Sequence, residues 1–355
     1  MASLSLRAPL DMKYGIGQLR PGTDPDSIAP ALAGVVPALR SRPRLQFDCP
    51  LPEAVLAATA EALSDNPHVQ LRARDRSLHP DLSWLARFAH LRHLHLDVWH
   101  ATSFDMVADF ENLRSLHLGR TRSAKPGLGF INRLERLVEL TIEGHGYDWA
   151  PLHPVTSLRG LHLHATHAAD LEPVRNQPSL EILTVHLGAI PDISLIAELP
   201  RLRGLELHQT NRVRSFDVDF LGDCVALEAL SLSALRDLTD LAALRRLPAR
   251  HLRFLILDGL PRLATLADLV GCQQLEELAL FDTRPADRRL DVILELPNLN
   301  HVVVGDEYPP GQIAALRQAF RGQSLAYRGE MLTGTQRAAK VSWRAPVSYL
   351  LDEAA

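Results

Sequence analysis

Histidines with acidic neighbours are the residues of this sequence whose types could support chemistry. The stretch "LRGLHLHATHAADLEP", residues 158–173, contains His162, His164 and His167. Histidines two positions apart can bind a metal ion, act as a general base, or simply stand as polar side chains on one face of a strand. The elements that carry these histidines decide between the three possibilities.

A short pattern, apolar-x-x-apolar-x-apolar, recurs through most of the chain. Ten copies, among them "LRHLHL" at 91, "LRSLHL" at 113, "LRGLEL" at 202 and "LEELAL" at 275, start 21 to 25 residues apart. The last two apolar residues alternate with a polar one, which is the period of a strand with one buried face. Such a short strand is stable only when copies stack in parallel, at about 4.8 Å, into a continuous sheet and core.

The repeat resembles that of the leucine-rich-repeat family, in which L-x-x-L-x-L recurs every roughly 20–29 residues. Its shorter copies, with "DLEPV" and "DISLI" after the strand, are most similar to the bacterial internalin-type class. The resemblance implies a curved α/β solenoid, with a parallel sheet on the concave face and short helices or 3-10 turns on the convex face. It also implies protein binding without catalysis as the default function.

Two caps are expected to flank the array, because the apolar edge of a terminal repeat is otherwise exposed. We assign residues 1–65 to an N-terminal α/β cap, 66–305 to about ten to eleven repeats, and 306–355 to a C-terminal helix–strand cap and tail. The family usually has an asparagine after the strand, whose side chain binds the backbone of neighbouring turns. Threonine takes that place in four repeats, at Thr121, Thr166, Thr210 and Thr283.

Composition excludes several classes of protein. A net charge of −4 gives no sign of nucleic acid or an anionic membrane as the main partner. No apolar stretch approaches the roughly 18 residues of a membrane span, and the first residues lack the pattern of a secretory signal. Only three lysines accompany the many arginines, which suggests a GC-rich bacterial genome. We expect a cytoplasmic protein.

Sequence motifs give no support for catalysis. Nucleotide-binding, phosphate-binding, zinc-protease and serine-hydrolase motifs are all missing, and no nucleophile accompanies the histidines, so we predict that the protein is not an enzyme. Cys224 and Cys272 share the phase of core residues in other repeats and stand two repeats apart. They are therefore predicted to be buried, unbridged thiols. Cys49 carries no signal of its own.

Residues between and just after the last two leucines of each repeat point away from the core, so they form two columns along the predicted sheet. The first column contains His95, His117, Thr141, His162, Thr184, Glu206, Ser231, Ile256, Ala279 and Val303. The second contains Asp97, Gly119, Glu143, His164, His186, His208, Ser233, Asp258, Phe281 and Gly305. The N-terminal half of the array thus presents histidine and acidic residues, and the C-terminal part is more apolar.

These columns and one adjacent loop form the predicted binding surface for an unidentified protein. Its members are His95, His117, Glu143, His162, His164, His186, Glu206, His208, Tyr147, Trp149 and Phe281. Tyr147 and Trp149 are included because tyrosine and tryptophan are enriched at binding hot spots. They could instead cap an irregular turn, a role that the position of Trp99 favours for that residue.

A second hypothesis concerns metal or small-ligand binding by the same face. His164, His186 and His208 should follow one another at about 4.8 Å, close enough for adjacent imidazoles to share a zinc ion. Glu143 and Glu206 would be additional or supporting ligands. The remaining possibility is a solvated polar face, because repetition multiplies any surface choice and spacing alone does not show convergence on one ion.

Overall fold

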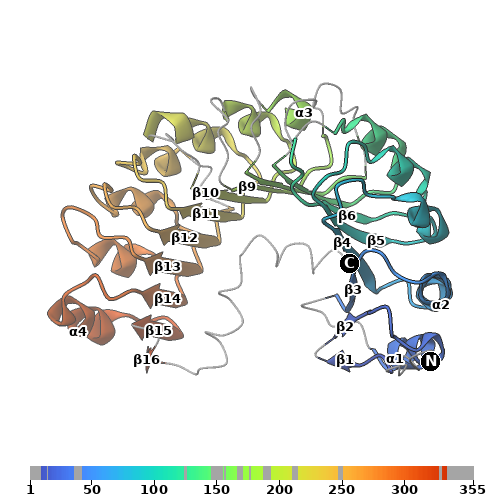
Figure 1. The fold of residues 1–355 in the computed structure, drawn as a ribbon. Helices are drawn as coiled ribbons and strands as arrows, with labels where there is room; N and C mark the ends of the chain where they lie inside the picture. Colours follow the sequence, from blue (N-terminus) through green and yellow to red (C-terminus); the bar gives the residue numbers. More distant parts are fainter. Residues whose placement is uncertain are drawn as a thin grey trace. The chain divides into compact units, whose positions relative to one another are not determined.

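The computed structural model describes residues 9–13, 15–35, 42–123, 126–144, 155, 157–165, 171–175, 177–186, 193–209, 215–246, 251–327 and 330–333. The chain forms two compact units, residues 1–158 and 159–355. In each of them the helical segments lie on one side of the strands (Figure 1). None of the helices in the described ranges is long and apolar enough to cross a membrane.

The first unit is built on a sheet whose strands follow chain order. The strands are β1 (Met12–Lys13), β2 (Ile16–Gln18), β3 (Arg44–Asp48), β4 (Gln70–Asp75), β5 (His93–Val98), β6 (Ser115–Leu118) and β7 (Glu139–Glu143). β1 and β2 are antiparallel, and each later pair is parallel. The connecting helices are η1 (Pro25–Ser27), α1 (Ile28–Ala33), α2 (Glu53–Asp65), η2 (Ser83–Phe88), η3 (Asp105–Asp109) and η4 (Gly129–Arg133).

The second unit continues the same alternation of strand and short helix. Its strands are β8 (Gly160–His164), β9 (Ile182–His186), β10 (Gly204–His208), β11 (Ala229–Ser233), β12 (Phe254–Asp258), β13 (Glu277–Phe281), β14 (His301–Val304), β15 (Ser324–Tyr327) and β16 (Glu330–Thr333). All pairs are parallel except the final hairpin of β15 and β16. The helices are α3 (Glu172–Arg175), η5 (Ser194–Glu198), η6 (Ser215–Asp223), η7 (Ala242–Arg245), η8 (Ala267–Gly271), η9 (Asp291–Glu295) and α4 (Pro310–Ala319).

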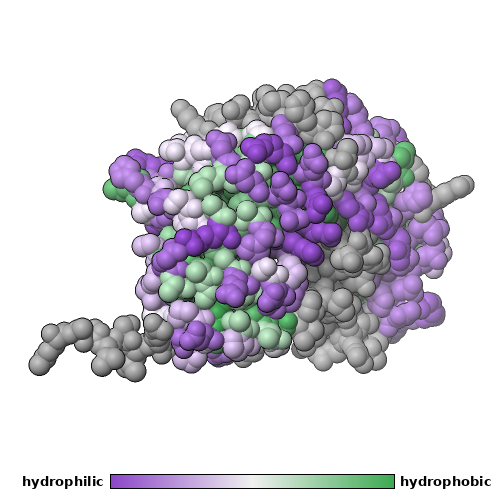
Figure 2. Space-filling view, turned by 90° about the vertical axis from the view of Figure 1, so that its right-hand side faces the viewer, coloured by the Kyte–Doolittle hydropathy of each residue, from purple (hydrophilic) through white to green (hydrophobic). Residues whose placement is uncertain are grey.

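The repeated leucines form the core, as the pattern predicts. Leu205 and Leu207 on β10 are both 0% exposed, and the equivalent residues of the other repeats are also buried. Figure 2 shows one face of the molecule as mostly hydrophilic, with hydrophobic side chains in small groups between the polar ones. Both predicted caps contain their helices and strands, but the strands β1, β2 and β16 were not predicted, and residues 334–355 of the tail lie outside the described residues.

Arginine and glutamate pairs join neighbouring strands of the second unit at the position that precedes each strand. Arg159 donates two hydrogen bonds to Glu181, at 2.9 and 2.6 Å. Two further bidentate pairs repeat this arrangement, Arg203 with Glu228 and Arg253 with Glu276. A bidentate pair fixes both distance and orientation, so these pairs help to hold the strands in register.

Six of the sixteen strands in the described part of the chain are followed directly by a residue with left-handed backbone conformation. The φ angles directly after β7, β8, β10, β11, β12 and β13 are 71° at Gly144, 49° at Ala165, 46° at Gln209, 53° at Ala234, 61° at Gly259 and 43° at Asp282. Threonine supports the turn that follows, because Thr283 Oγ1 accepts a hydrogen bond from the backbone N–H of Leu260 and donates one to the carbonyl of Phe281. Thr121 is also buried, whereas Thr166 and Thr210 lie outside the described residues.

Candidate functional site

Strand register places the predicted columns on the sheets as expected. In the first unit His95 pairs with His117, and His117 with Thr141. In the second unit His164 pairs with His186, and His186 with His208. We call the face of each sheet that carries these columns its open face.

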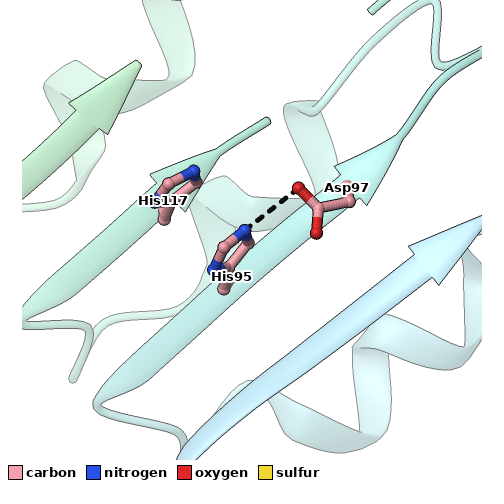
Figure 3. Close-up of side chains that lie close together, drawn as sticks. All are labelled: His95, Asp97 and His117. Atoms are coloured by element: carbon pink, nitrogen blue, oxygen red, sulfur yellow. Dashed lines mark hydrogen bonds and ion pairs between the residues drawn. The ribbon is translucent and has the colours of Figure 1, made fainter. Parts of the chain in front are cut away.

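A network of four side chains lies on the open face of the first unit. The rings of His95 and His117 stack with centroids 3.6 Å apart and planes at 14° (Figure 3). His95 Nε2 lies 3.0 Å from Asp97 Oδ1, and His117 Nε2 lies 3.1 Å from Glu143 Oε1. Gly119 makes room for this arrangement, because a Cβ at that position would collide with Asp97 Oδ1. Each histidine is therefore held by one acidic partner.

Burial and charge contacts set the protonation of His95 and Asp97. It lowers the pKa of His95 to about 4, although the hydrogen bond to Asp97 opposes the change. Burial alone would raise the pKa of Asp97, but contact with His95 and Arg72 outweighs it and lowers the pKa to about 2. Near neutral pH His95 is therefore uncharged and donates its Nε2 proton to the Asp97 carboxylate. Burial, followed by the charge of Arg42, lowers the pKa of the neighbouring His93 to about 3.

Among the described residues, a group of potential metal ligands lies in this network. The histidines His164, His186 and His208, which the sequence suggested as metal ligands, do not form such a group. Among the described residues, the ligand atoms that all lie within 4.8 Å of one another belong to His95, Asp97 and His117. Arg72, however, is already bound to the Asp97 carboxylate, with a nitrogen 2.6 Å from Oδ2. A divalent cation would have to displace or approach that guanidinium. The positive charge of the Arg72 guanidinium, so close to the Asp97 carboxylate, repels a metal cation and disfavours its binding.

An arginine-rich hollow of about 460 Å³ adjoins the network. It is lined by Arg72, Arg74, Arg76, Asp97, Trp99, Arg120 and Glu143. Trp99, whose position in the sequence favours a role in capping a turn, is 42% exposed. The four arginines were not predicted as site residues. A signal existed in "LRARDRS" at 71–77, where arginine alternates with buried residues at Leu71, Ala73 and Asp75.

The histidine column of the second unit is continuous. The ring centroids of His164 and His186 are 4.7 Å apart, and those of His186 and His208 are 5.1 Å apart. His186 Nε2 lies 3.0 Å from Glu206 Oε1. Burial would raise the pKa of Glu206, but the contact with His186 and the charges of the nearby histidines lower it. His162 lies one column away and contacts Thr184 Oγ1 at 3.0 Å through Nδ1.

Apolar side chains follow this column along the open face of the second unit. Ala279, Val303 and Ala326 are buried there, and the larger Ile256 and Phe281 pack against them. The predicted change from a polar to an apolar surface is therefore present in the structure. Tyr147 and Trp149, the two loop members of the predicted surface, lie outside the described residues.

The cysteines match their predicted structural role. Cys224 and Cys272 are buried, and all three cysteines are unpaired. Burial raises the pKa of each thiol, including that of Cys49, to about 12. These thiols stay protonated at neutral pH and are poor nucleophiles.

The repeating parallel strands, the buried leucine ladder and the short returns define the fold of a leucine-rich-repeat protein. An internalin (InlF) from Listeria monocytogenes is similar in structure, with a TM-score of 0.58 and 18% identity over 85% of this chain and 93% of that one. Toll, in its complex with Spätzle from Drosophila, is similar with a TM-score of 0.52 and 16% identity over 88% of this chain and 47% of that one. Comparison with protein families and with curated proteins gave no match.

Proposed function

We propose that the protein is a non-catalytic scaffold that binds another protein through the open faces of its sheets and the loops beside them. The observation that carries this proposal is the open face of the second unit, where polar and apolar side chains adjoin in register. Glu206 and His208 on β10 lie in the same columns as Ile256 on β12 and Phe281 on β13. Protein interfaces combine an apolar centre with a polar rim in this way.

The chemistry of the described residues supports binding over catalysis. His95, His117 and His186 each contact a carboxylate from the same sheet. The thiols have raised pKa values, so no activated sulfur accompanies the imidazoles. The structure of Toll in complex with Spätzle is an example of this fold engaged with another protein. A cytoplasmic location remains part of this proposal, and cell fractionation with an antibody against the protein tests it.

The proposal is tested by affinity capture from native host lysate with three purified proteins. The first is the unaltered chain and the second combines His208→Ala with Phe281→Ala on the open face. The third, Val225→Ala, is a matched control, because Val225 lies in the same unit, outside both columns, and is 60% exposed. Circular dichroism should show that all three are equally folded.

We expect at least one protein to be enriched by the unaltered chain and by the control, and to be depleted about tenfold or more by the open-face variant, the loss expected when hot-spot residues are truncated. Equal capture of the same proteins by all three would contradict binding through this face. If only the Val225→Ala variant failed to capture the partner, the binding surface would include Val225 and not the open face.

A further inference from the structure

The arginine-rich hollow of the first unit has a local structural origin. Alternation along β4 places Arg72 and Arg74 on the open face while Leu71, Ala73 and Asp75 are buried. Arg76 follows directly after β4 and is exposed. The fourth arginine, Arg120, comes from the turn after β6. Strand pairing thus brings guanidinium groups from two separate segments to one hollow.

Two of these arginines already have carboxylate partners. Arg72 binds Asp97, and Arg74 Nε lies 2.9 Å from Asp48 Oδ1. Glu143, the other acidic residue that lines the hollow, lies 3.1 Å from His117. Within the described part of the chain, neither Arg76 nor Arg120 has a carboxylate oxygen within 4 Å. The hollow therefore retains two guanidinium groups without an acidic partner.

The backbone beside Arg120 fits its position along the wall of the hollow. Gly144, the residue after β7, has a φ of 71°, and a Cβ there would lie 2.8 Å from Arg120 Cγ. The glycine therefore lets the aliphatic part of the arginine lie against the turn. This contact restricts the side chain before any ligand is present, and such restriction lowers the entropy cost of binding.

Charge and shape both select the class of ligand. The four arginines face three carboxylates, Asp97 and Glu143 in the lining and Asp48 on Arg74. The remaining positive charge lies on Arg76 and Arg120, and it attracts an anion and repels a cation. Guanidinium groups bind phosphate oxygens through paired hydrogen bonds. A phosphate monoester carries about −1.5 to −2 charge near neutral pH, which matches two unpartnered arginines better than the single charge of a carboxylate. The exposed ring of Trp99 offers an apolar surface at the same hollow, and the volume of about 460 Å³ falls in the usual range of ligand pockets.

We propose that this hollow binds a phosphate monoester carried by a side chain of a protein partner. Arg76 and Arg120 bind the phosphate oxygens, and Trp99 contacts the residue that carries the phosphate. Arg72 and Arg74, each held by a carboxylate, form the floor of the hollow. This inference rests on the proposed function, since it names the chemistry of the partner. It places a recognition site on the first unit, separate from the apolar surface of the second.

The test is isothermal titration of the full chain with short peptides that are identical except at one residue. That residue is phosphotyrosine, phosphoserine, tyrosine or glutamate, and inorganic phosphate and adenosine monophosphate are titrated in parallel. The variants are Arg76→Gln, Arg120→Gln and the double change. Arg136→Gln is the matched control, because it removes one positive charge from an exposed arginine of the same unit, whose side chain donates a hydrogen bond to Asn112. Thermal melting establishes that each variant is folded.

We expect a phosphorylated peptide to bind at least tenfold more tightly than its unphosphorylated and glutamate counterparts. Each arginine variant should weaken that binding at least tenfold, the control should not, and added salt should weaken it further. Equal affinity for phosphorylated and unphosphorylated peptides, or binding unaffected by both arginine changes, would overturn the proposal. Tighter binding of free phosphate or of the nucleotide would overturn a protein-borne source. If the peptides fail while capture still depends on His208 and Phe281, only this inference falls and the proposed function stands.

Discussion

Protonation of His95 offers a quantitative test of the network on the first unit. The pKa of this imidazole falls from 6.5 to about 4 because the ring is buried. A folded-state pKa below the unfolded value means that His95 must stay neutral for full stability. Its contribution is therefore complete above pH 6.5 and is lost as the pH falls from 6.5 towards 4. Linkage gives a loss of about 2 kcal/mol between pH 7.5 and pH 5 from this residue alone.

Urea unfolding at these two pH values measures the loss, with His95→Gln as the comparison. Glutamine can donate to Asp97 but does not titrate. The free energy of unfolding should fall by about 2 kcal/mol less for the variant than for the unaltered chain, because the variant lacks the titrating imidazole. The same pH dependence in both proteins, or a midpoint near 6.5 in an NMR titration of the His95 ring, would show that burial does not lower the pKa of His95.

Three further predictions concern the core, the turns and metal binding. Leu205→Ala should lower the free energy of unfolding by about 2–5 kcal/mol in denaturant melts, and a loss under about 0.5 kcal/mol would contradict its burial. Ala234→Gly should stabilise the protein by up to about 1 kcal/mol, and Gly259→Ala should destabilise it by a similar amount, because both positions have left-handed backbone. Thermal melts in which both variants shift the melting temperature in the same direction would contradict this. Protein purified without a histidine tag should retain well under one equivalent of zinc by elemental analysis. One equivalent of zinc that is lost when His164, His186 and His208 are changed to alanine would instead support the metal hypothesis.

Periodicity explains why the fold could be predicted so fully from the sequence. Each repeat must bury the same apolar positions against its neighbours, so the spacing of Leu205 and Leu207 fixes which side chains face the core. The same constraint fixes the two columns, and strand pairing confirms them in both units. Left-handed turn residues such as Ala165 and Gln209 have no sequence signal, because both are ordinary side chains in an unusual conformation.

Properties that arise between repeats were harder to predict. The stacking of His95 on His117 could be expected from the register, but the burial that lowers the pKa of His95 depends on its neighbours. The arginine-rich hollow requires Arg76 from one segment and Arg120 from another to meet in space. The sequence shows the alternating arginines of β4, but no local motif encodes their meeting with Arg120, so the hollow itself is evident only in the structure.

Site-specific photo-crosslinking tests the central claim, that the open face holds a protein partner, most directly. A benzophenone amino acid replaces Phe281 on the open face in one protein and Val225, outside both columns, in another, and each is irradiated in native host cells. We expect a discrete protein adduct from position 281 and none from position 225. An adduct from position 225 with none from position 281 would contradict it.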